Sequence, residues 1–389
     1  MSKPEKRTTL AVCRRRYAEL RGKKAKGALL DEFCALTGLH RKHALRMLNA
    51  RDGRRKRRRG HPKAYSVDAV RLLTRIWKLA GRPCGKLLRP VLKDIIASLR
   101  RHETLDEDVA AELLKMSPST LDRRLRHAKP RLGRSRRRAD SLAEHRRAIG
   151  LKAGVWPSSS RQTPGWVEVD TVAHCGGDMG GSFVWTLTAC DTATQWTEMR
   201  PAWNKGAHAV CGALREAFGA LPLKIRGVNT DNGPEFLNAH LAREFPQLCP
   251  DAVRSRSRPY AKNDNPHVEQ KNGHAVRRLL GYGRLMHEET VGALRDLLAA
   301  ASLLGNLYRP TLKLLEKRRE NARWIKRFEK EPKTPAQRAL ESPDVSDADK
   351  RRVRGLLSAN DFITLRQRVD RLLAEFTRQD ALLDSRIVF

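Results

Sequence analysis

Three short motifs, each built around an acidic residue, constrain this chain of 389 residues more than any other feature. Asp170 lies in an alternating run that predicts a β-strand. Asp231 follows a second alternating run, a predicted strand over 223–228, and precedes an Asn-Gly-Pro turn. Glu269 lies on a predicted helix that Asn265-Pro266 begins. Acids on three separate elements can converge on one point, where their hard oxygens suit a divalent cation.

Each acid also has an ordinary structural explanation. Asp170 could be a strand-end carboxylate, Asp231 could cap the Asn-Gly turn, and Glu269 could be a solvated helix residue. Two neighbouring acids are given structural roles. Glu168 shares a strand face with Asp170 but is not expected to be a ligand, and Glu235 is expected at a helix start, where the dipole favours an acid.

The three motifs together resemble the D-D-E catalytic core of the retroviral-integrase-like transposases, and bacterial insertion-sequence members in particular. Two flanking stretches carry the resemblance, Asp231-Asn-Gly-Pro-Glu-Phe and residues 258–272. The interval from Asp231 to Glu269 is 38 positions. The resemblance covers about residues 160–290 and implies an α/β, RNase H-like fold for them.

The resemblance implies phosphoryl transfer on DNA, in which a transposase cleaves the ends of an insertion element and joins them to a target. The catalytic and metal-binding residues would be Asp170, Asp231 and Glu269, holding two Mg²⁺ ions, with Mn²⁺ able to substitute. Double-stranded DNA would be the partner, bound by a homo-oligomer in a synaptic complex. Two alternatives stay open: a catalytically silent DNA-binding regulator derived from a transposase, and an RNase H-type nuclease.

The charge balance independently indicates a polyanionic partner. The formal net charge is +36, and residues 1–150 hold 42 basic and 15 acidic residues, against 37 and 28 in the remainder. Duplex binding is therefore expected mainly in the N-terminal part. The odd count of seven cysteines without Cys-x-x-Cys spacing, and the lack of a secretory or membrane-spanning segment, predict a cytoplasmic protein. The resemblance implies that it is bacterial and nucleoid-associated.

The sequence predicts a multidomain chain with an N-terminal all-α region, a central α/β core and a mostly α C-terminal region. Residues 1–60 are expected to form a helix-turn-helix with a basic arm, and 61–130 a helical region with a second helix-turn-helix. Residues 131–160 read as a basic linker, 161–289 as the integrase-like core, and 290–389 as a helical basic region.

The first helix-turn-helix is predicted within residues 30–49, with Gly38 in the turn. An ordinary helical hairpin with a charged face is the alternative. The residues expected to face a DNA groove are His40, Arg41, Lys42, His43 and Arg46. The basic arm would contact phosphates through Arg54, Arg55, Arg57, Arg58 and Arg59.

The second helix-turn-helix is predicted over 108–128, with Ser117 as the N-cap of its second helix. Its outward residues are Ser119, Thr120, Arg123 and Arg124. Lys262, Lys271 and Arg277 are the predicted DNA contacts beside the acids. The resemblance implies basic residues one and two turns after Glu269, but Gly273 and Val276 stand there, with Arg277 next to them.

Alternation and helical periodicity predict a mixed sheet flanked by helices in the core. The expected strands are 166–172, 183–189, 194–199, 223–228 and 253–255, and the expected helices are 207–218, 235–244 and the one carrying Glu269. In the tail, residues 313–330 are basic and include Trp324 and Phe328. They could clamp DNA or pack on the core as an amphipathic helix.

Overall fold

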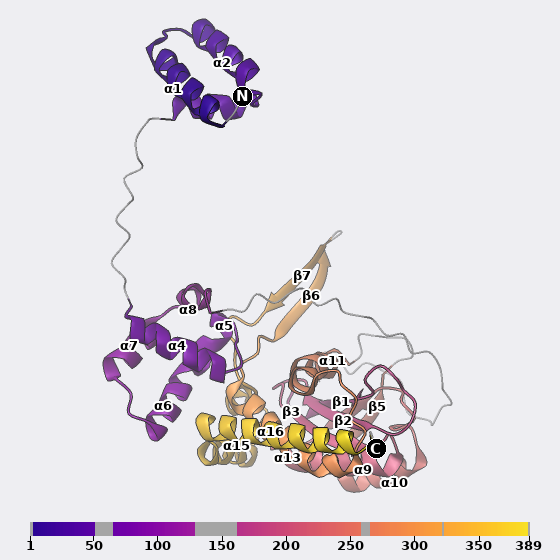
Figure 1. The fold of residues 1–389 in the computed structure, drawn as a ribbon. Helices are drawn as coiled ribbons and strands as arrows, with labels where there is room; N and C mark the ends of the chain where they lie inside the picture. Colours follow the sequence, from indigo (N-terminus) through magenta and orange to yellow (C-terminus); the bar gives the residue numbers. More distant parts are fainter. Residues whose placement is uncertain (1–2, 51–64, 129–161, 258–264, 321–322, 388–389) are drawn as a thin grey trace. The chain divides into compact units, whose positions relative to one another are not determined.

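The computed structural model describes residues 3–50, 65–128, 162–257, 265–320 and 323–387 (Figure 1). The chain divides into two compact units, Met1–Ala64 and Tyr65–Phe389. The predicted basic arm at 54–59, the predicted linker 131–160 and Lys262 lie outside the described residues.

Three helices form the first unit: α1 (Lys3–Glu19), α2 (Lys23–Thr37) and α3 (Arg41–Asn49). Gly38 ends α2 with a φ of 67°, a left-handed conformation that glycine adopts without penalty. His40 then caps α3, because its Nδ1 accepts a hydrogen bond from the Lys42 N–H at 3.3 Å. All three helices contribute buried side chains to one core, namely Cys13, Tyr17, Leu29, Leu30, Phe33, Ala44 and Leu48.

The second unit opens with five helices, α4 (Val67–Leu79), α5 (Gly85–Leu88), α6 (Leu92–His102), α7 (Glu107–Lys115) and α8 (Pro118–Leu125). Ser117 caps α8 by accepting a hydrogen bond from the Thr120 N–H, which confirms the predicted N-cap. Two side chains of α6 bind the same carboxylate near the C-terminus. Ser98 donates a hydrogen bond of 2.6 Å to Asp361, and His102 Nε2 lies 3.0 Å from it.

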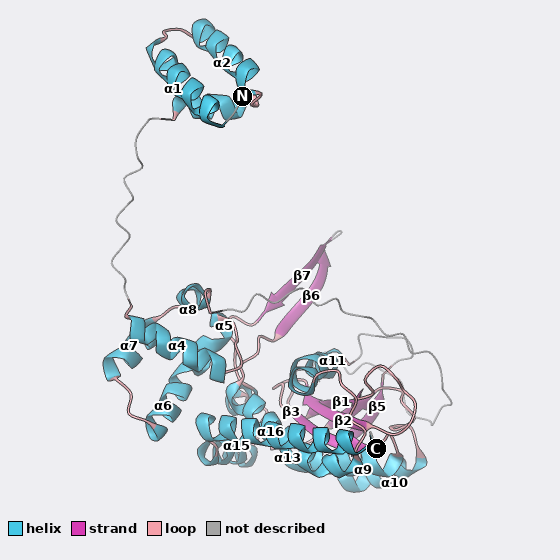
Figure 2. Ribbon diagram, in the orientation of Figure 1, coloured by secondary structure: helices cyan, strands magenta, loops and turns pink. Residues whose placement is uncertain are grey.

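A five-stranded sheet forms the centre of this unit: β1 (Trp166–Ala173), β2 (Val184–Asp191), β3 (Thr197–Trp203), β4 (Gly227–Thr230) and β5 (Val253–Arg256). The strand order is β3-β2-β1-β4-β5. Figure 2 shows the strands in magenta among cyan helices. The pairs β1–β2 and β2–β3 are antiparallel, whereas β1–β4 and β4–β5 are parallel. All eight residues of β2 are buried. The mixed sheet with flanking helices confirms the predicted α/β class of the core.

Helices connect and cover these strands: α9 (Ala207–Ala220), α10 (Ala239–Leu248), α11 (Pro266–Lys271), the π-helical turn η2 (Asn272–Val276), α12 (Arg277–Leu280) and α13 (Val291–Tyr308). Both α9 and α13 pack against β3. The connection from β4 runs through α10 to β5, and α11 is the next element after β5 among the described residues. The segment carrying Glu269 therefore begins soon after the strand beside β4.

Three predicted elements of the core are misplaced. The strand predicted over 194–199 begins at Thr197, because the Asp191 carboxylate accepts the Thr194 N–H and holds a turn there. The strand predicted over 223–228 begins only at Gly227. The helix predicted over 235–244 begins at Ala239, since the Asn238 side chain accepts a hydrogen bond from the Leu241 N–H and caps it.

The C-terminal region is helical apart from one hairpin. Its elements after α13 are β6 (Leu314–Glu320), β7 (Arg323–Phe328), α14 (Pro335–Glu341), α15 (Asp347–Ala359) and α16 (Phe362–Ile387). The strands β6 and β7 form a separate two-stranded sheet, so the expectation of an amphipathic helix over 313–330 is wrong. Among the described residues, no helix has both the length and the apolar composition needed to cross a membrane.

Candidate active site

The parallel pairing of β1 with β4 brings two of the predicted acids together. The register aligns Glu168 with Asn229 and Val169 with Thr230. Asp170 follows Val169 within β1, and Asp231 is the first residue after β4. The two carboxylates therefore lie beside each other at one edge of the sheet, and the Asp231 charge acts directly on Asp170.

Asp170 sits in a crowded and largely dehydrated position. Its Oδ1 accepts the Thr171 N–H at 2.7 Å, and its Oδ2 accepts a hydrogen bond from Asn272 Nδ2 at 2.7 Å. Burial and then the charge of Asp231 raise the pKa of Asp170 to about 7, against the opposing effect of the Thr171 N–H, and Glu269 adds a smaller repulsion. A carboxyl group held this way gains from any cation that neutralises the cluster.

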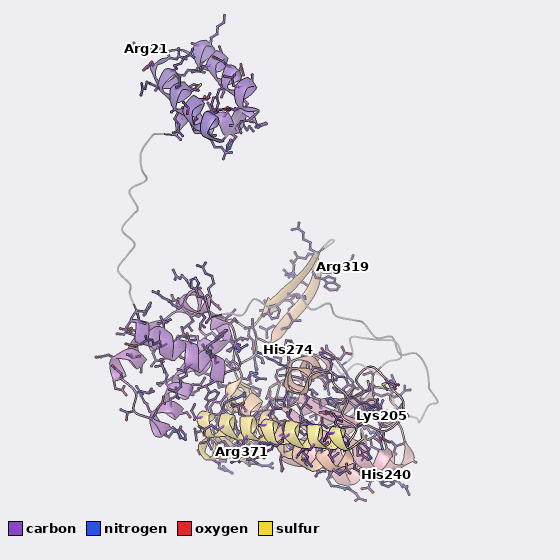
Figure 3. The ribbon with its side chains drawn as sticks, in the orientation of Figure 1. Arg21, Lys205, His240, His274, Arg319 and Arg371 are labelled. Atoms are coloured by element: carbon purple, nitrogen blue, oxygen red, sulfur yellow. The ribbon has the colours of Figure 1, made fainter. Side chains whose placement is uncertain are left out.

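A fourth acid, Glu235, stands next to Asp231. Its side chain is buried and its Oε1 lies 2.6 Å from Lys205 Nζ, a residue labelled in Figure 3. Burial and then the Glu235 charge raise the pKa of Asp231, while Lys205 lowers it. The expected role of Glu235 at a helix start is wrong, because α10 begins at Ala239.

Gly233 permits the close approach of this fourth acid. A Cβ atom at Gly233 would come within 2.3 Å of Glu235 Oε2, so only glycine leaves room for the carboxylate. The Gly233 N–H also donates a hydrogen bond of 2.9 Å to Asp231 Oδ1. The Asn-Gly-Pro turn therefore positions Asp231 and packs on Glu235 at the same time.

Glu269 lies exposed on α11, and strand β1 holds the start of that helix. Glu168, 1% exposed, accepts hydrogen bonds through Oε2 from the His267 N–H at 2.8 Å and the Val268 N–H at 3.1 Å. An acid at a helix N-terminus is stabilised by the helix dipole and by the otherwise unpaired N–H groups. Asp170 and Glu168, whose carboxylate holds the start of α11, thus lie two residues apart on the same strand.

Strand β4 holds the same helix through a buried amide pair. Asn229 Nδ2 donates a hydrogen bond of 2.5 Å to the Oδ1 of Asn265, the residue before α11. Ser255 of β5 donates to Asn229 Oδ1 at 2.8 Å and fixes its orientation. The helix of Glu269 is therefore tied to the two strands that carry the other acids.

If Glu269 is a metal ligand, Glu168→Ala should lower the activity that depends on it by about 10- to 100-fold, the usual cost of losing a group that orients such a ligand. The change leaves two buried N–H groups at the start of α11 without their acceptor, which costs about 1–3 kcal/mol of unfolding free energy. Glu168→Gln keeps an acceptor oxygen and should recover part of both losses. Thermal melts and cleavage assays on the three proteins check this, and equal activity in the folded alanine variant would refute it.

The carboxylate oxygens suit a hard divalent cation, but the described acids do not converge on one point in this structure. Within the described residues, no three His, Cys, Asp or Glu side chains come close enough to hold an ion. Asp170 is bonded to the Asn272 amide instead. The oxygens present are nevertheless those that Mg²⁺ takes, and Glu235 Oε2 is buried without a hydrogen-bond partner in this part of the chain.

The predicted DNA-contact residues of the first unit lie along α3. Arg41, Lys42, His43 and Arg46 are all exposed, and Arg41 forms an ion pair with Asp31. His40 is exposed as well but serves as the helix cap.

The predicted contacts on α8 are more varied in their surroundings. Ser119 and Arg123 are exposed. The hydroxyl of Thr120 is bonded to that of Ser117, and the Arg124 guanidinium lies over the Tyr65 ring at 5.7 Å. All five of these side chains are polar groups on one short helix and its cap, so α8 presents a polar surface.

The two predicted DNA contacts after Glu269, Lys271 and Arg277, are not simple surface cations. Lys271 is half-buried against β2, where burial lowers the pKa of its ammonium group and Cys190 opposes that shift. Arg277 donates a hydrogen bond of 2.6 Å to the Ala173 carbonyl and lies over the Tyr282 ring at 5.0 Å. Lys271 therefore packs α11 against the sheet. Arg277 ties α12 to β1 and to the loop that follows α12.

The comparisons with known proteins identify the class of the central domain. The family described as "Integrase core domain" matches residues 160–256, a range that includes all five strands of the large sheet, Asp170 and Asp231. The chain therefore carries an integrase core domain.

The chain is also 38% identical over 307 residues to a protein of Sinorhizobium fredii (strain NBRC 101917 / NGR234) described as "Uncharacterized protein y4rM". That alignment covers 78% of this chain and 86% of y4rM. The chain belongs to the same family as y4rM. Among solved structures, the catalytic core domain of BIV integrase is similar over 37% of this chain and 85% of that one, with 16% identity and a TM-score of 0.28.

Sequence reasoning did not find the residues that organise the acids. Glu168 was set aside as a non-ligand, which is consistent with its helix-capping contacts, but the capping role was not foreseen. Lys205 and Asn272 were not singled out at all, although each contacts an acid of the site. The one available signal was Glu235, since it stands inside the Asp-Asn-Gly-Pro-Glu motif.

Proposed function

We propose that this protein is a DNA transposase that cleaves the ends of its insertion element and joins them to target DNA. The observation that carries the proposal is the β1–β4 pairing, which sets Asp170 beside Asp231 at the strand ends. The hydrogen bond from the His267 N–H to Glu168 supports the inclusion of Glu269, because it ties the helix of Glu269 to the strand of Asp170. The integrase core domain supports phosphoryl transfer as the reaction class.

Asp170, Asp231 and Glu269 would hold the metal ions of this reaction. Two bound Mg²⁺ ions would supply activation of an attacking oxygen and neutralisation of the leaving oxygen. The protein's own groups set the geometry, because Gly233 fixes Asp231 and Asn272 orients Asp170. Lys205 limits the net charge of the cluster by pairing with Glu235.

Duplex DNA is the proposed partner of the N-terminal regions. The first 150 residues carry most of the chain's positive excess, with 42 basic against 15 acidic residues. Arg41, Lys42, His43 and Arg46 lie exposed on the short helix α3, which follows a tight turn after α2. A helix presented this way suits the major groove, and its cations suit the flanking phosphates.

The test is cleavage of duplex DNA that carries the sequences flanking this reading frame. We expect nicking at the element ends that requires Mg²⁺ or Mn²⁺, and no cleavage of an RNA–DNA hybrid of the same sequence. Preferred cleavage of the hybrid would indicate a nuclease of the RNase H type. Tight binding of the flanking duplex without nicking in either metal would indicate a DNA-binding regulator.

A further inference from the structure

The hairpin formed by β6 and β7 is the most exposed sheet of the second unit. It pairs with no strand of the five-stranded sheet, and all six residues of β7 are exposed. Arg319, labelled in Figure 3, stands close to its turn. An isolated two-stranded ribbon gains little stability from its own pairing, so a surface of this kind is suited to binding something else.

On one face of the ribbon, two glutamates offset most of the positive charge of three arginines. Directly opposed residues share a face, and the register opposes Glu316 to Arg327, Arg318 to Ile325 and Glu320 to Arg323. Arg327 lies 3.1 Å from Glu316, and Arg318 lies 2.7 Å from Glu320. These six residues, called the paired face below, hold three arginines and two glutamates.

The opposite face carries cations and aromatic rings but no acid. The register opposes Arg319 to Trp324 and Leu314 to Phe328, and Lys326 lies between Trp324 and Phe328 on the same side of β7; these five residues form what is called the cationic face below. Trp324 is 57% exposed and Phe328 is 44% exposed. All the acids of β6 thus stand on the paired face.

We propose that the cationic face binds the backbone of duplex DNA, with Trp324 and Phe328 packing against the sugar or groove edge. A two-stranded ribbon fits the major groove, which is about 12 Å wide. A second copy of this chain is a poorer occupant, because a protein of net charge +36 repels a face whose only charges are positive. The inference rests on the proposed DNA partner and adds a contact surface outside the active site.

The test compares two full-length double variants that each remove one cation from each strand. Arg319→Ala with Lys326→Ala alters the cationic face, and Arg318→Ala with Arg323→Ala alters the paired face. The probe is a fluorescein-labelled 30-base-pair duplex, titrated by anisotropy at several NaCl concentrations. Loss of two phosphate contacts should reduce the slope of log affinity against log salt by about 1.8 for the cationic-face variant. The paired-face variant should lose less than half as much.

Trp324→Ala is an independent test of the same surface. It should weaken binding at high salt without changing the salt slope, because it removes an apolar contact and no charge. Equal losses of DNA affinity in the two double variants would show that DNA responds only to the overall positive charge of the protein. That result would overturn the proposal. So would a change in oligomeric state by light scattering with unchanged DNA affinity, which would mark a protein interface.

The results of these binding experiments do not depend on whether the protein cleaves DNA. If wild-type protein binds the duplex in this face-dependent way but never nicks DNA, the proposed enzymatic function fails and the ribbon contact stands. If it nicks end-bearing DNA while both double variants bind like wild type, the ribbon contact fails alone.

Discussion

Asp231→Asn is expected to abolish cleavage and strand transfer while the protein stays folded and keeps its DNA affinity. Asparagine retains the oxygen that accepts the Gly233 N–H, but it removes the negative charge that a metal ion needs. Loss of a direct ligand should cost more than the roughly 100-fold that loss of a ligand's supporting partner can cost. Metal-dependent nicking of end-bearing DNA measures this.

A thermal melt shows whether the variant is folded, and nicking by the same preparation then separates this expectation from a purely structural Asp231. Burial and the charge of Glu235 raise the pKa of Asp231, so removing its charge should leave the melting temperature unchanged or higher. A residue that only capped the turn would predict both a near-normal melting temperature and retained activity, because asparagine caps about as well as aspartate. Asp251→Asn is the matched control, because Asp251 pairs with Lys224 on the surface at 3.1 Å. Normal nicking by folded Asp231→Asn would remove this residue from the site.

The second expectation concerns pH. The pKa of Asp170 is about 7 in the folded protein, above its ordinary 3.8, so the folded state binds a proton that the unfolded state releases. The metal-free protein should therefore lose stability as pH rises from about 4 to about 7, by a few kcal/mol in total. Above that range the cost is constant, because both states are ionised.

Added Mg²⁺ should reverse this loss. The ion binds the ionised carboxylates of the folded state, so its stabilising effect on the melting temperature should be larger at pH 8 than at pH 5.5, with proton release on binding. Asp170→Asn is the comparison that isolates one group among many. The difference in melting temperature between wild type and this variant should change steadily between about pH 4 and pH 7 and level off above that. A difference that stays flat across that range would show that Asp170 is not the titrating group.

Local patterns predicted the elements whose signal lies in their own residues. The helix expected over 207–218 forms as α9 over Ala207–Ala220, and the strand expected over 166–172 forms as β1. The strand expected over 223–228 started too early because Leu223 is buried by packing and not by strand pairing. An alternating pattern records burial on one side, and burial alone does not say where pairing begins.

The site shows the same division between local and long-range information. Asp170, Asp231 and Glu269 were predicted because each stands in a short motif of its own. The contacts that support them join residues far apart in sequence, such as Lys205 with Glu235 or Asn272 with Asp170. No periodicity in one sequence encodes such a pair, since neither partner differs from an ordinary polar surface residue until the sheet brings them together.

The π-helical turn η2 shifts the positions of the side chains that follow it on the helix of Glu269. A π turn takes up one residue more than an α-helical turn, so every side chain beyond Asn272–Val276 is displaced by one place relative to an unbroken helix. Arg277, eight positions after Glu269, therefore occupies the place that the seventh residue would hold. There its guanidinium reaches the Ala173 carbonyl at the end of the strand that carries Asp170. An ungapped alignment with a relative lacking this turn would match Arg277 to the wrong column.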